Sequence, residues 1–112
     1  MKSCLIIGAN GFIGSRLCRE LSNQGVQVHA TSRNSAPIDG ASSQSVLDIT
    51  DKKDVESLLQ SCPADTLYFL AAVTEHHRLI HDPVGCLEAY ASAAINLVNG
   101  VKNSHISRVV YS

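Results

Sequence analysis

The stretch Ile6-Ile7-Gly8-Ala9-Asn10-Gly11-Phe12-Ile13-Gly14 places three glycines at three-residue intervals directly after a short apolar run. That run, from Ser3 to Ile7, is typical of a buried parallel strand, because it is apolar and is ended by a glycine. From Gly11 to Gln24 the apolar residues recur at helical spacing. The sequence therefore predicts a strand, a glycine-rich turn and a helix in that order.

The rest of the chain continues the same alternation. We expect strands at residues 26–30, 45–49, 66–70 and 108–111, and helices at residues 51–60 and 84–102. Thr50 is the expected N-cap of the first of these two helices, since a hydroxyl there can accept a hydrogen bond from a free amide. Alternating strands and helices predict βαβ units, a parallel sheet and right-handed crossovers.

Composition excludes several classes of protein. The chain has 112 residues, and 9 Lys and Arg against 10 Asp and Glu give a net charge of −1. Without a basic surplus a nucleic-acid partner is not expected. The length suits one domain at most. Only 17% of the residues are charged, against about 25% in an average domain, so we expect apolar surface that something else covers.

The sequence also indicates where the protein resides. Gly8, Asn10 and Gly11 interrupt the N-terminal apolar run too early for a signal peptide, and no run reaches the roughly 18 apolar residues of a membrane span. The four cysteines are widely spaced without a CxxC pair: Cys4, Cys18, Cys62 and Cys86. Such cysteines are typical of reduced thiols that pack as small hydrophobic residues. We expect a cytoplasmic protein with no membrane partner.

The glycine-rich turn indicates a ligand. Gly8 allows a sharp turn at the end of the strand, and Gly14 allows the helix to pack closely on it. Gly11 has no Cβ, so a pyrophosphate can approach the helix N-terminus, where free N–H groups favour negative charge. At a strand-to-helix turn this spacing predicts a bound dinucleotide. The alternative is a tight turn that binds nothing.

The stretch 6–14 resembles, almost residue for residue, the cofactor-binding turn of the short-chain dehydrogenase/reductase superfamily. The match is to its extended branch, the NAD-dependent epimerase/dehydratase group. The resemblance continues through Leu47-Asp48-Ile49-Thr50, Phe69-Leu70-Ala71-Ala72, Asp82-Pro83, Asn96-Leu97-Val98 and Arg108-Val109-Val110-Tyr111-Ser112. It implies an α/β fold: a Rossmann-like doubly wound parallel sheet of about five strands in the order 3-2-1-4-5, truncated after the fifth strand. Residues 1–112 would then be an incomplete NAD(P)-binding segment without a substrate domain.

The resemblance implies a cofactor site at the glycine turn, at the turn after the third strand and at the end of the fourth strand. In the family an Asp and the apolar residue after it contact the adenine, and the end of the fourth strand passes over the cofactor. With the residues that close the second strand, the expected site is Gly8, Asn10, Gly11, Phe12, Ile13, Gly14, Ser32, Arg33, Asp48, Ile49, Leu70, Ala71 and Ala72.

The end of the second strand indicates which cofactor binds. A carboxylate there would accept hydrogen bonds from the ribose 2′-hydroxyl, but Ala30-Thr31-Ser32-Arg33-Asn34 contains no acid. Arg33 lies 19 residues after Gly14, where the ribose-reading group is expected. Its guanidinium can clamp a phosphate, and Ser32 adds a hydroxyl. We therefore expect NADP, with NAD as the alternative; Arg33 as a solvated loop residue is the other reading.

The catalytic residues of the family are not expected in this chain. The family uses a Tyr-x-x-x-Lys pair to move a proton, and none of Tyr68, Tyr90 and Tyr111 has a lysine four positions later. By resemblance, the parent protein would catalyse NADP-dependent hydride transfer on a nucleotide sugar or a similar alcohol or carbonyl substrate. The alternative is a non-catalytic, stand-alone NADP-binding or interaction protein.

Two further features bear on metals and partners. His77 and His81 are four residues apart, but no third ligand follows at a suitable spacing, so a polar loop is expected there and no metal site. The fifth strand leaves an edge of the sheet unpaired, and unpaired edges recruit partners. We expect a homo-oligomer formed through that exposed edge or face.

Overall fold

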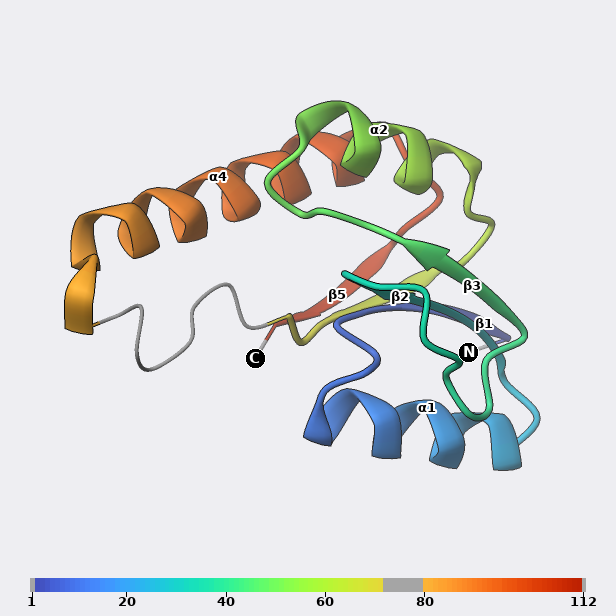
Figure 1. Ribbon diagram of the computed structural model, residues 1–112. Coiled ribbons are helices and arrows are strands. Elements are labelled where there is room, and N and C mark those ends of the chain that lie inside the picture. Colours follow the sequence, from blue (N-terminus) through green and yellow to red (C-terminus); the bar gives the residue numbers. More distant parts are fainter. Residues whose placement is uncertain (1, 72–79, 112) are drawn as a thin grey trace.

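The strands of the protein form one parallel sheet that separates α1 from α2 and α4 (Figure 1). The computed structural model describes residues 2–71 and 80–111. The elements are β1 (Ser3–Ile7), α1 (Phe12–Asn23), β2 (Gln27–Ser32), β3 (Ser43–Val46), α2 (Lys52–Ser61), β4 (Thr66–Phe69), α4 (Pro83–Lys102) and β5 (Arg108–Tyr111). The strand order is β3-β2-β1-β4-β5, and every pairing is parallel. The predicted α/β class and strand order are confirmed.

The central strand explains why helices are needed on both sides. In a strand successive side chains point to opposite faces. Cys4 and Ile6 of β1 pack with α1, whereas Leu5 and Ile7 pack in the cluster that contains residues of α2 and α4. All four are buried. The carboxyl end of β1 is therefore fixed from both faces, and it is there that the glycine turn begins.

The third strand lies earlier than the sequence predicts. It covers Ser43–Val46 rather than 45–49, paired with β2 from His29 to Ser32. After Val46 the chain leaves the sheet in a turn that the side chain of Asp48 stabilises. That carboxylate accepts hydrogen bonds from Thr50 N at 3.0 Å and from Thr50 Oγ1 at 2.6 Å.

The cap of α2 also differs from the prediction. Asp51, not Thr50, is the N-cap, and its Oδ1 accepts hydrogen bonds from Lys53 N at 3.0 Å and Asp54 N at 3.2 Å. The hydroxyl of Thr50 is already engaged with Asp48. The second strand also reaches Ser32, two residues beyond the predicted end.

The four cysteines are buried and unpaired, as expected of small packing residues: Cys4, Cys18, Cys62 and Cys86. Burial raises the pKa of Cys4 to about 11, so this thiol stays protonated near neutral pH. Within the ranges that the structure describes, no helix combines the length and the hydropathy that crossing a membrane requires.

Exposed apolar side chains gather on α4 and at the edge strand β5. They include Val84, Leu87, Ile95, Val98, Val109 and Tyr111. Leu87 is 70% exposed and Tyr111 is 57% exposed, although the Tyr111 ring stacks on Phe69 at a centroid distance of 5.0 Å. A large part of the exposed apolar surface expected from the low charge content lies here.

Candidate functional site

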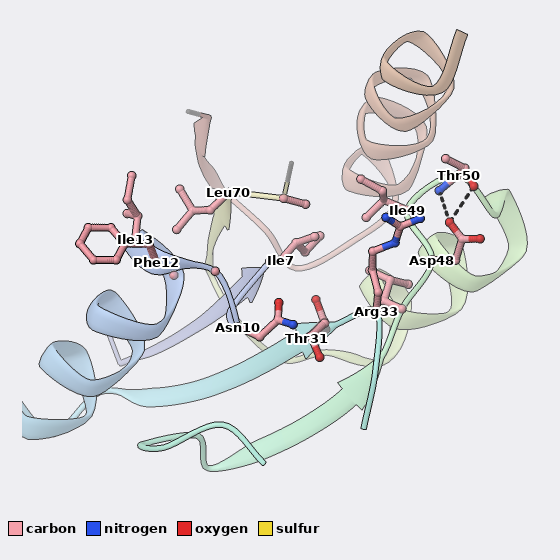
Figure 2. Close-up of a pocket in the computed structure, with 16 residues that line it drawn as sticks. Ile7, Asn10, Phe12, Ile13, Thr31, Arg33, Asp48, Ile49, Thr50 and Leu70 are labelled. Carbon is pink, nitrogen blue, oxygen red and sulfur yellow. Dashed lines mark hydrogen bonds between the residues drawn. The ribbon is translucent and has the colours of Figure 1, made fainter. Parts of the chain in front are cut away.

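A cleft of about 390 Å³ opens at the carboxyl ends of β1, β2 and β4 (Figure 2). Within the sheet, β2 and β3 lie on one side of β1, whereas β4 and β5 lie on its other side, so the direction of strand addition reverses at β1. Open parallel sheets bind ligands at this kind of switch point. The lining residues are Ile7, Gly8, Asn10, Gly11, Phe12, Ile13, Gly14, Thr31, Ser32, Arg33, Leu47, Asp48, Ile49, Thr50, Leu70 and Ala71.

The floor of the cleft is the glycine turn, where backbone segments approach too closely for side chains. Gly8 has a φ of +91°, and a Cβ there would lie 2.6 Å from Ala71 N. A Cβ on Gly14 would lie 2.2 Å from Gly8 O. The amides of Gly8 and Ala9 both donate to Thr31 O, at 3.1 and 2.9 Å. The turn is thus held between the ends of β1, β2 and β4.

The N-terminus of α1 faces the cleft and is not closed by the protein's own side chains. Its N-cap is Gly11, so no capping side chain accepts a hydrogen bond from the first amides, and the first turn contains no acid. A Cβ on Gly11 would contact Gly8 O alone, at 3.5 Å, so the space beyond it is open. The first amides of a helix lack intrahelical acceptors and carry the positive end of its dipole. This end of α1 can therefore receive an anion.

Large apolar side chains form one wall at the mouth of the cleft. Phe12 and Ile13, at the start of α1, are 80% and 61% exposed. The Arg16 guanidinium lies 5.7 Å from the centroid of the Phe12 ring. Leu70, the residue that follows β4, belongs to the same lining (Figure 2). A flat, partly apolar ligand in the cleft would cover this surface.

The opposite wall is the turn between β3 and α2. Hydrogen bonds from the hydroxyl and the amide of Thr50 hold the pKa of the Asp48 carboxyl below its ordinary value, and the charge of Arg33 adds a smaller lowering. Asp48 is therefore ionised at neutral pH and turned toward Thr50 (Figure 2). Ile49 lies beside it and is 8% exposed.

Arg33 and Ser32 stand at the end of β2. Arg33 is exposed, and in Figure 2 it extends from the end of β2 toward Ile49 and Asp48. Ser32 is buried, and its hydroxyl donates to Asn34 O at 2.7 Å. The hydroxyl proton of Ser32 is thus donated to a backbone carbonyl of the loop that follows β2. This differs from the expectation that Ser32 offers a hydroxyl to a phosphate.

The structure brings the predicted site residues from Gly8 to Ala71 together in this one cleft. Ala72 and His77 lie outside the described residues. Four lining residues were not predicted: Ile7, Thr31, Leu47 and Thr50. Leu47 and Thr50 flank the predicted pair in the same turn, and Thr31 lies opposite Ile7 in the parallel register. Across residues 2–71 and 80–111, no three His, Cys, Asp or Glu side chains are grouped in a way that could hold a metal ion.

A doubly wound parallel sheet with a glycine-rich turn between β1 and α1 defines a Rossmann-like α/β protein. The sequence model of the NAD dependent epimerase/dehydratase family matches residues 4–112. The chain therefore belongs to the NAD-dependent epimerase/dehydratase family.

Solved structures share the fold. A UDP-glucose-4-epimerase from Stenotrophomonas maltophila, with bound NAD and formylated UDP-arabinopyranose, is 24% identical with a TM-score of 0.83; the match covers 99% of this chain and 36% of that one. A GalE-like L-threonine dehydrogenase from Cupriavidus necator, in its holo form, is 21% identical with a TM-score of 0.81, over 96% of this chain and 35% of that one. The UDP-glucose 4-epimerase of Thermus thermophilus in complex with NAD is 23% identical with a TM-score of 0.80, over 96% and 36%. The chain spans about a third of the length of these proteins.

Proposed function

We propose that the cleft binds a dinucleotide cofactor, and that the cofactor is NADP(H). The observation that carries the proposal is the N-terminus of α1, whose first amides face the cleft without a capping side chain at Gly11. These amides would hold the pyrophosphate. Asp48 and Ile49 would contact the adenine side, and Leu70 and Ala71 would lie along the opposite part of the cofactor.

The preference for NADP(H) is supported by the charges at the end of β2. Arg33 is exposed and lines the cleft, and a guanidinium can bind a phosphate through two parallel hydrogen bonds. Residues 30–34, at the end of β2, contain no acid. No carboxylate is therefore present there to accept hydrogen bonds from a ribose 2′-hydroxyl, which is the contact that favours NAD.

For the complete protein we propose hydride transfer between the cofactor and a nucleotide sugar or a similar alcohol or carbonyl substrate. Membership of the NAD-dependent epimerase/dehydratase family supports this class of reaction. The printed sequence contains no Tyr-x-x-x-Lys pair, so this chain is assigned cofactor binding and no proton-transfer residue.

Calorimetric titration of the purified chain with NADPH and with NADH tests the cofactor proposal. NADPH should bind more tightly, and Arg33→Glu should reverse the order because the new carboxylate repels a 2′-phosphate. Arg19→Glu is the matched control, since Arg19 is an exposed residue of α1 that does not line the cleft. Tighter binding of NADH to the wild-type chain would refute the NADP assignment, and no binding of either would refute the site.

We also propose that the chain self-associates through β5 and the exposed apolar side of α4. β5 is the last strand of the sheet in the described part of the chain. Leu87 and Val98 expose large apolar side chains on α4. Sedimentation should show a dimer or larger species that Leu87→Lys weakens, and a concentrated wild-type monomer would refute the proposal.

A further inference from the structure

Asn96 is a buried amide in the middle of α4, on the side that faces the sheet. It is 6% exposed, and its Nδ2 donates to Ile49 O at 3.0 Å. The bond joins residues 47 positions apart in the sequence. A buried side-chain amide needs its partners, because leaving either group unpaired costs the full desolvation penalty. The contact therefore fixes the position of the β3–α2 turn relative to α4.

The turn that receives this bond is stiff within itself. The Asp48 carboxylate accepts two hydrogen bonds from Thr50, and Asp51 N donates to Asp48 O at 3.0 Å. Leu47 N donates to Ser32 O at 2.9 Å and so ties the start of the turn to β2. The side chains of Leu47 and Ile49 are also buried in the core cluster. The bond from Asn96 to the Ile49 carbonyl adds a polar attachment between the turn and α4.

Packing between α4 and α2 adds a second constraint close by. A Cβ on Gly100 would lie 2.5 Å from Leu59 Cδ1, so α4 approaches α2 closely one turn beyond Asn96. Both Asn96 and Gly100 are buried. The two positions lie four residues apart and therefore share one face of α4. The donor on Asn96 is thus held at a set distance from the turn.

Ile49 is the link between this bond and the cleft. Its carbonyl accepts the hydrogen bond from Asn96, and the same residue lines the cleft beside Asp48 and Arg33. We propose that Asn96 is a positioning residue for cofactor binding, which acts by holding the Ile49 wall in place. The inference rests on the proposed cofactor site. It adds a residue outside the lining, from an element that supplies none of the cleft's lining residues.

The test compares Asn96→Leu and Asn96→Asp with Asn99→Leu and Asn99→Asp, since Asn99 is exposed on the same helix. Dissociation constants for NADPH and NADH are measured by calorimetry. Asn96→Leu should weaken the better-bound of the two about 10-fold, because the Ile49 carbonyl loses its donor and the wall shifts. Both Asn99 variants should stay within about 2-fold of the wild type.

Asn96→Asp supplies a readout that general damage to the fold would not produce. At pH 8 the introduced carboxylate has no proton to donate, so binding should be about 10-fold weaker than in the wild type. Burial raises the pKa of a carboxyl group, and in its protonated form the group can donate to Ile49 O. The ratio of variant to wild-type affinity, measured at one pH at a time, should therefore return toward one as the pH is lowered to about 5.

The outcomes separate the two claims. If the wild-type chain binds neither NADPH nor NADH, the proposed cofactor site is wrong. If the wild type binds a cofactor and both Asn96 variants bind it as tightly as the wild type at every pH, the cofactor site stands and only the positioning role is wrong. Should Asn96→Leu fail to fold, nuclear magnetic resonance of the wild type decides. The side-chain amide protons of Asn96 should shift on binding of NADPH, and unchanged shifts at saturation would overturn the role.

Discussion

The N-termini of α1 and α2 flank the same cleft, yet the protein treats them in opposite ways. α2 begins at Asp51, whose carboxylate accepts hydrogen bonds from two backbone amides, and Asp54 adds a negative charge in its first turn. α1 begins at Gly11, with no capping side chain and no acid in its first turn. Both helices follow a strand of the sheet and both starts lie near the cleft lining.

The difference distinguishes a helix N-terminus that the chain itself caps, at α2, from one that is left open for a ligand, at α1. An Asp at the N-cap satisfies the free amides and the dipole from within the chain. A glycine leaves both unsatisfied at the position where a ligand can enter. α4 supports the distinction, because Asp82 caps it by accepting from Gly85 N at 3.1 Å. Of the three helix N-termini that the structure describes with bounds, the one left open is at the cleft.

Closing the open helix end should give the largest effect. In Gly11→Asp, the new carboxylate would occupy the N-cap of α1 and its charge would oppose the pyrophosphate. We expect the affinity for NADPH to fall about 100-fold, while the free energy of unfolding stays the same or rises by a few tenths of a kcal/mol. Calorimetry and urea unfolding measure the two quantities.

Gly11→Ala is the control for this change, because the backbone at Gly11 is extended and a Cβ there would make only an ordinary contact. Its affinity should lie between those of the wild type and of Gly11→Asp. Wild-type affinity in Gly11→Asp would mean that the α1 N-terminus does not bind the pyrophosphate.

Opening the closed helix end should give a smaller effect of the opposite kind. Asp51→Ala removes the acceptor for the amides of Lys53 and Asp54. We expect the free energy of unfolding to fall by about 1 kcal/mol, and the affinity for NADPH to change by less than about 2-fold. Asp39→Ala removes an exposed acid from the loop after β2 and should alter stability by less than about 0.5 kcal/mol. A large loss of affinity with unchanged stability in Asp51→Ala would reverse the assignment of the two helix ends.

Local patterns in the sequence predict most of this architecture, and the third strand shows where they stop. Leu47 and Ile49 are apolar, and for that reason the predicted strand covers 45–49. In the structure these two side chains leave the sheet and join the core cluster that contains α2 and α4 residues. The observed strand, Ser43–Val46, is exposed throughout and carries no alternating pattern. Burial in this segment is set by helices distant in the sequence, which periodicity cannot detect.

The site is predictable to the same extent. The glycine turn can be predicted because its backbone conformation and close contacts require glycine at certain positions. The change from strand to helix periodicity then shows where in the sequence the turn lies. Thr31 contributes through its carbonyl, which accepts hydrogen bonds from Gly8 N and Ala9 N. Because every residue has a backbone carbonyl, the sequence does not reveal this contact. Thr50 and Asp51 are both good N-caps, so the choice between them depends on Asp48 engaging the Thr50 hydroxyl.

The smallest expected effect concerns that Asp48–Thr50 contact. Hydrogen bonds from Thr50 lower the pKa of the Asp48 carboxyl in the folded protein. A group whose pKa is lowered by folding stabilises the protein above its unfolded pKa, about 3.9 for Asp, and loses that contribution as the pH falls through the folded value. Thr50→Val removes the hydroxyl donor and keeps the amide. The pKa of Asp48 should therefore rise part of the way toward its ordinary value.

Nuclear magnetic resonance titration of the carboxyl groups measures this pKa directly. The difference in unfolding free energy between wild type and Thr50→Val should be constant above about pH 5. It should shrink as the pH falls below about 4, first through the pKa of Asp48 in Thr50→Val and then through the lower pKa in the wild type. Ser35→Ala, which removes an exposed hydroxyl after β2, should follow the wild type at every pH. An Asp48 that titrates identically in wild type and Thr50→Val would show that the turn before α2 is not held by its own side chains. The contrast with the open start of α1 would then rest on Asp51 alone.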